Sequence, residues 1–151
     1  MRETFHMTRS MRIGSTMLTA LLRAGLPLGS LTLLSVRGRK SGKISTIPVA
    51  LVEQDGTSFL VAAFGEVSWV RNLRATGQAQ LTRRRRTEAI GVVELGTREA
   101  APILKQFLTN YHLVPFIPPY FDVTSQSPLA DFEREASHHP VFRIVRTNVM
   151  E

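Results

Sequence analysis

A basic turn between two strand-like runs constrains the fold of this chain more than any other feature. The apolar run over residues 31–36 leads into residues 37–43, which hold two glycines and four cationic side chains. A second strand-like run, residues 44–53, leaves this turn. Such a turn brings cations, the Ser41 hydroxyl and backbone N–H groups to one place, which is what a phosphate or another anion requires.

The rest of the chain continues as short strands with a few flanking helices. Strands are expected over residues 58–64, 78–82, 87–95 and 141–145, and helices over residues 10–24, 67–75, 97–112 and 128–137. Strands joined by short turns close more readily into a small barrel than into a doubly wound parallel sheet. We therefore expect a mainly β fold with flanking helices (α+β), formed by residues 1–151 as a single domain.

Composition narrows the classes of partner. The net charge of +7 favours an acidic partner, which leaves nucleic acid, anionic lipid and a polyanionic small molecule open. The chain has no cysteine, which excludes disulfides and thiol nucleophiles, and its four histidines lack metal-site spacing, so we expect no metal. One tryptophan and two tyrosines supply few surfaces for base stacking, which argues against a barrel that binds nucleic acid.

Residues 1–24 form a basic segment with apolar side chains at helical spacing. The apolar stretch is interrupted by Arg23 and is too short for a membrane span, and no small-residue cleavage site follows it. Two interpretations stay open for this N-terminal amphipathic helix: it covers the domain, or it rests on a membrane surface. The chain is expected to be cytoplasmic, with peripheral membrane contact in the second case.

A second group of residues follows the third predicted strand. Trp69, the single tryptophan, opens a predicted helix, and Asn72 lies three positions further on. This spacing places both side chains on nearly the same helix face. They border a ligand groove in one interpretation; in the other, Trp69 fills the core and Asn72 caps backbone groups.

Taken together, these segments resemble the deazaflavin-dependent nitroreductase and F420H2-dependent quinone reductase family. The family consists of small split-β-barrel proteins, similar to the FMN-binding split barrel. The resemblance is carried by residues 38–43 with Pro48, by residues 65–75, and by the segment 139–143.

The resemblance implies that the chain binds coenzyme F420, an 8-hydroxy-5-deazaflavin with a phosphate and an oligoglutamate tail; FMN is the alternative cofactor. Lys40, Ser41 and Lys43 are expected to hold the phosphate. Pro48 and Ala63 are expected to approach the flat ring. The whole predicted cofactor set is Arg39, Lys40, Ser41, Gly42, Lys43, Pro48, Ala63, Trp69 and Asn72.

The resemblance also implies hydride transfer from the reduced cofactor to a quinone, an enone or a nitroaromatic compound, with quinones as the leading class. The best-characterised branch of the family carries a serine where this chain has Phe64. Phe64, Tyr111 and Tyr120 are expected to shape the substrate pocket, and the two tyrosines are the candidate proton donors. No other catalytic residue is identified.

Other functions are compatible with the same residues. A cofactor carrier without turnover is the first alternative, and a basic β-barrel that binds nucleic acid is the second. The run Arg83 to Arg86 is expected at a hairpin tip, either solvated or in contact with the oligoglutamate tail. Arg71 and Arg74 are further cations that such a tail could meet. A homodimer is left open as the oligomeric state.

Overall fold

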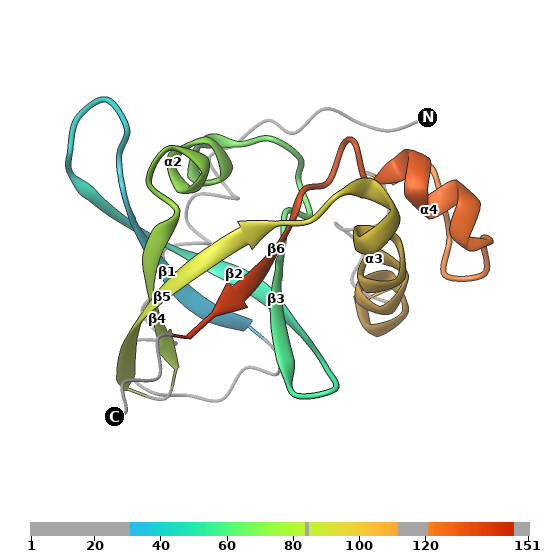
Figure 1. Cartoon of the computed structure of the whole chain (residues 1–151), viewed down its shortest axis with the longest axis horizontal. Coiled ribbons are helices and arrows are strands. Elements are labelled where there is room, and N and C mark those ends of the chain that lie inside the picture. The colour runs from blue at the N-terminus through green and yellow to red at the C-terminus, as the bar shows by residue number, and fades with distance from the viewer. Residues whose placement is uncertain (1–30, 84, 112–120, 147–151) are drawn as a thin grey trace, which may run out of the picture.

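The protein is a closed antiparallel β-barrel with helices beside it (Figure 1). The structure, a computed structural model, describes residues 31–83, 85–111 and 121–146, and only the backbone of Leu31 and Tyr111. The strands close in the order β1-β2-β3-β6-β5-β4. Their bounds are Leu31–Arg37 (β1), Ile44–Gln54 (β2), Thr57–Val61 (β3), Gln78–Arg83 (β4), Arg86–Glu94 (β5) and Val141–Val145 (β6). This architecture confirms the expected mainly β barrel.

Three helices accompany the barrel in the described part of the chain. They are α2 (Ser68–Thr76), α3 (Thr97–Tyr111) and α4 (Leu129–Glu135). Helices α3 and α4 pack on each other beside the barrel, whereas α2 lies against β1 and β4 (Figure 1). The helix predicted over residues 10–24 lies outside the described residues.

The third strand is shorter than predicted, and the expected end at residue 64 is wrong. The ladder stops at Val61, where the chain turns because Ala63 N–H donates to the Val61 carbonyl at 3.1 Å and Gly65 N–H to that of Ala62 at 3.2 Å. Gly65 has φ +91°, a conformation that favours glycine. The apolar residues 62–64 therefore belong to the turn that follows β3 and not to the strand.

The arginine hairpin also differs from the expectation. Arg83 and Arg86 pair with each other in the β4–β5 ladder, so they are strand residues rather than parts of the tip. Arg85, in the turn itself, has φ +67°. Strand alternation therefore decides where the side chains of Arg83 and Arg86 point.

Alternation along the strands builds two apolar cores. In β2, Val49 and Leu51 belong to the core inside the barrel, and Ala50 and Val52 belong to a second core on its outer face. Successive side chains of a strand point to opposite faces, so one strand serves both cores. Helices α3 and α4 cover the outer core, which includes Leu104, Phe107, Leu108 and Phe132.

Helix α2 contributes Val70 and Leu73 to the inner core. The helix ends at Gly77, which has φ 71° and donates its N–H to the Leu73 carbonyl. This left-handed cap turns the chain directly into β4. The cap fixes α2 beside the start of β4.

A buried histidine ties α4 to the end of β3. His139 and Glu135 are 1% and 2% exposed, and His139 Nε2 lies 3.0 Å from a carboxylate oxygen of Glu135. His139 Nδ1 lies 3.0 Å from the Ala62 carbonyl oxygen, and the ring stacks on Phe121 at 3.8 Å. A carbonyl oxygen only accepts, so Nδ1 carries a proton and donates it. The pair therefore holds the segment that follows β3.

Candidate functional site

The basic turn between β1 and β2 is held by its own hydrogen bonds. Gly38 N–H donates to the Lys43 carbonyl at 2.8 Å, Gly42 N–H donates to the Gly38 carbonyl at 3.0 Å, and Lys43 N–H donates to Ser41 Oγ at 3.1 Å. Gly42 has φ +73°. The positive φ of Gly42 favours glycine at that position, whereas a Cβ at Gly38 would lie 2.8 Å from Ser41 Oγ and would displace that side chain.

These bonds leave few backbone donors for a ligand. In the described part of the chain, only the N–H groups of Lys40 and Ser41 in residues 38–43 have no acceptor. The side chains of Lys40 and Lys43 are exposed and have no carboxylate partner among the described residues. Two ammonium groups beside two free amides fit an anion such as a phosphate group.

Asn72 connects this turn to helix α2. Its side chain is 8% exposed, and its Oδ1 accepts hydrogen bonds from Arg39 N–H at 3.1 Å and from Arg39 Nη1 at 2.7 Å. The second interpretation expected Asn72 to bond to backbone groups, and one such bond, from a backbone N–H, is observed. That N–H belongs to the basic turn rather than to the helix, so Asn72 positions the turn.

Trp69 lies at the boundary between core and surface. The indole is half-buried, packs against the inner core and lies 6.2 Å from the Phe142 ring, centroid to centroid. The core interpretation of Trp69 therefore holds for part of the side chain. The remainder is accessible on the same helix that carries Asn72.

Pro48 and Ala63 come from neighbouring segments. Pro48 lies in β2, where it pairs with Leu33 of β1, and Ala63 follows β3, the other neighbour of β2, and packs on the outer core. Both residues are half-buried, and so is Phe64, which follows Ala63. The side chain of Tyr111 and the whole of Tyr120 lie outside the described residues.

Arg74 is occupied by two carboxylates. Its Nη1 lies 2.6 Å from Glu66, while Nε and Nη2 hold both oxygens of Glu94 at 2.8 and 2.7 Å. The hydrogen bond from Arg74 lowers the pKa of Glu66, and the two carboxylates raise the pKa of Arg74. Arg74 is thus neutralised locally and offers little charge to an anionic tail. Arg71 is exposed on the same helix.

The arginine hairpin lies at the other end of the barrel from the basic turn. Leu33, near the start of β1, pairs with Thr82, the neighbour of Arg83, whereas the basic turn follows the last residue of β1. The seven residues of β1 separate the two places by about 20 Å. A single anion of phosphate size therefore cannot contact both groups of cations.

The described residues contain neither a metal site nor a membrane-spanning helix. No group of three or more His, Asp or Glu side chains there could hold a metal ion. No helix in that part of the chain is long and apolar enough to span a membrane.

The comparison with protein families shows the family to which the chain belongs. The model of the family described as F420H(2)-dependent quinone reductase matches residues 2–112. The chain belongs to the F420H(2)-dependent quinone reductase family. The resemblance drawn from the basic turn and the Trp69 segment is confirmed, and the protein is an F420-dependent reductase.

Solved structures share the fold of this family member. A structure described as an F420-H2 dependent reductase (FDR-A) is 24% identical, with a TM-score of 0.53, over 77% of this chain and 94% of that one. A domain-swapped dimer is 20% identical, with a TM-score of 0.54, over 91% and 100%. These similarities confirm the split-barrel fold class. No curated protein matches the sequence.

Proposed function

We propose that this reductase holds the anionic tail of F420 at the basic turn and reduces a quinone. Lys40, Ser41 and Lys43 are the residues proposed to bind the phosphate. The observation that carries this proposal is the pair of exposed ammonium groups, without carboxylate partners in the described residues, on a turn that Asn72 fixes to α2. The description of the family supports the quinone as acceptor.

The bound deazaflavin would supply the hydride, so the protein's task is to bind and orient it. Pro48 and Ala63 are small and half-buried on adjacent segments, which suits close approach of a flat ring. The accessible part of Trp69 is proposed to border the same groove as Asn72. Phe64, next to Ala63, offers an apolar surface to the quinone ring and lacks a hydroxyl group.

The binding step can be tested by titrating the protein with F420 and following cofactor fluorescence. We expect saturable binding that Lys40→Gln or Lys43→Gln weakens about tenfold, the value of one charged hydrogen bond. Arg98→Gln is the matched control, because it removes one positive charge from the surface of α3, away from the basic turn. The Arg98 side chain is 93% exposed. An equal loss of F420 affinity in Arg98→Gln would show that the basic turn contributes only its net charge to binding.

The substrate class needs a separate experiment. Oxidation of reduced F420 is followed after adding menadione, an enone or a nitroaromatic compound in parallel reactions. We expect the highest kcat/KM with menadione. Binding of F420 without turnover of any acceptor would favour the carrier alternative, and faster turnover of the nitro compound would contradict the quinone assignment.

A further inference from the structure

The end of the barrel opposite the basic turn is lined by polar residues where the strands otherwise point apolar side chains inward. We call this layer the barrel mouth. It consists of Glu53, Ser58, Arg83, Arg86, Glu88 and Arg146. Each has the same alternation as inward residues of its own strand, as Arg83 has with Leu81 and Arg146 with Ile144. Strand order therefore brings these polar residues together from β2, β3, β4 and β5 and from the residue that follows β6.

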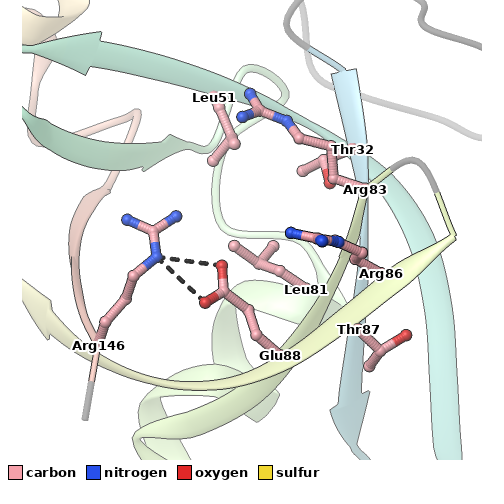
Figure 2. A pocket seen from close by; sticks show the side chains of 8 residues that line it. All are labelled: Thr32, Leu51, Leu81, Arg83, Arg86, Thr87, Glu88 and Arg146. Carbon is pink, nitrogen blue, oxygen red and sulfur yellow. Dashed lines mark hydrogen bonds and ion pairs between the residues drawn. The ribbon is translucent and has the colours of Figure 1, made fainter. Parts of the chain in front are cut away.

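The barrel mouth is hollow. A cavity of about 400 Å³ is lined by the side chains of Arg83, Arg86 and Arg146 and by Leu51 and Leu81 of the inner core (Figure 2). Figure 2 shows Arg86 and Arg146 extending toward this space from opposite sides. Pockets for small ligands have volumes of roughly 300–1,000 Å³, so the cavity suits a compact molecule.

The ion pairs of the barrel mouth leave one cation over. Arg146 Nε lies 3.0 and 3.2 Å from the two oxygens of Glu88, and Arg83 lies 3.6 Å from Glu53. Arg86 has no carboxylate partner among the described residues. Three guanidinium groups against two carboxylates give the layer a net charge of +1, which one negative charge would neutralise.

Arg146 is also prepared for a further contact. Its Nε is used by Glu88 and its Nη1 donates to Ser58 Oγ at 3.4 Å, so these bonds hold the guanidinium plane in place. Its remaining terminal nitrogen, Nη2, has no acceptor among the described residues. A held guanidinium loses less side-chain entropy when it binds a planar anion.

We propose that the barrel mouth binds a small aromatic carboxylate. The carboxylate would lie between Arg86 and Arg146, and the ring would lie over Leu51 and Leu81. A carboxylate carries one negative charge, which would neutralise the net charge of +1 of the layer. Its two oxygens can accept two parallel hydrogen bonds from a planar guanidinium, which a spherical ion cannot do. The site is separate from the proposed F420 site because the two lie at opposite ends of β1.

The test uses the full chain and benzoate, titrated by calorimetry at low salt. We expect saturable binding that Arg86→Gln weakens about tenfold. Arg86→Lys should also weaken binding, because lysine keeps the positive charge but lacks the planar guanidinium with its paired N–H donors. The control Arg98→Gln and the turn variant Lys43→Gln should bind benzoate as the wild type does. Arg86 has no carboxylate partner among the described residues, so its variants should keep the wild-type melting temperature.

Three results would overturn the proposal. They are heat that does not saturate with benzoate, equal weakening by Arg98→Gln, and a site that saturates with inorganic phosphate while benzoate fails to bind. Loss of F420 binding in Lys43→Gln with benzoate binding intact would show that the two sites are independent. This arrangement separates a failure of the barrel-mouth proposal from a failure of the proposed function.

Discussion

The buried pair His139–Glu135 allows a quantitative test of how α4 is attached to the barrel. In Glu135→Leu the histidine would keep its bond to Ala62 but lose the carboxylate 3.0 Å from Nε2. Removing one member of a buried hydrogen-bonded pair costs about 1–3 kcal/mol, because the polar group that stays loses this contact where water cannot replace it. His139→Phe should cost at least as much, since it removes both the contact to Glu135 and the donor to the Ala62 carbonyl.

The double variant His139→Phe/Glu135→Leu should be more stable than His139→Phe alone. Phenylalanine can keep the stacking on Phe121, and both members of the buried pair are gone. The remaining loss is the Ala62 carbonyl without its donor, which is worth about 1–3 kcal/mol. The two substitutions should therefore be non-additive, with a coupling of about 1–3 kcal/mol.

Urea denaturation measures these differences. Circular dichroism follows the whole fold, and the fluorescence of Trp69, the single tryptophan, follows the inner core. Coincident transitions by the two probes would justify a two-state treatment. Single variants that lose less than about 1 kcal/mol, or a double variant that loses the sum of both, would refute the reasoning about a buried pair.

Three further predictions concern the basic turn and its surroundings. Asn72→Ala should weaken F420 binding severalfold in a fluorescence titration, because it frees the Arg39 amide and guanidinium; unchanged affinity would contradict the positioning role. Gly38→Ala should also weaken binding with little change in melting temperature, since its Cβ displaces Ser41 Oγ. Glu66 has a lowered pKa in the folded protein, so its contribution to stability is present above its ordinary pKa of 4.5 and is lost as the pH falls through the folded value. Both members of its ion pair are partly exposed, so Glu66→Gln should cost under about 1 kcal/mol at pH 7, and the cost should shrink as the pH falls below 4.5.

Local patterns predicted most of the elements, but they could not predict every boundary or the strand order. The strands β1, β2, β4, β5 and β6 follow apolar runs and turn residues, and Gly42 stands where the backbone favours glycine. The apolar run through Phe64 was read as strand because sequence does not show that the ladder ends at Val61. The insertion of β6 between β3 and β5 depends on contacts between residues about 80 positions apart, which no local pattern contains.

The candidate site was predicted in part for the same reason. The cations of the turn are evident because they are consecutive, and the Trp69 segment is evident as a motif. The bond between Arg39 and Asn72 spans 33 positions, and the occupation of Arg74 by Glu94 spans 20 positions, so sequence alone did not reveal either. Arg146 was not singled out, although strand alternation from Phe142 and Ile144 would have placed it in the barrel mouth.

The position of β6 in the barrel has a consequence for synthesis in the cell. Until residues 141–145 have been made, β3 and β5 each present an unpaired edge, and the inner core lacks Phe142 and Ile144. Open edges of this kind recruit strands from other molecules. A nascent chain stalled before Val141 should therefore depend on chaperones. Once residues 141–145 have been synthesised, β6 can pair with β3 and β5 and close the barrel.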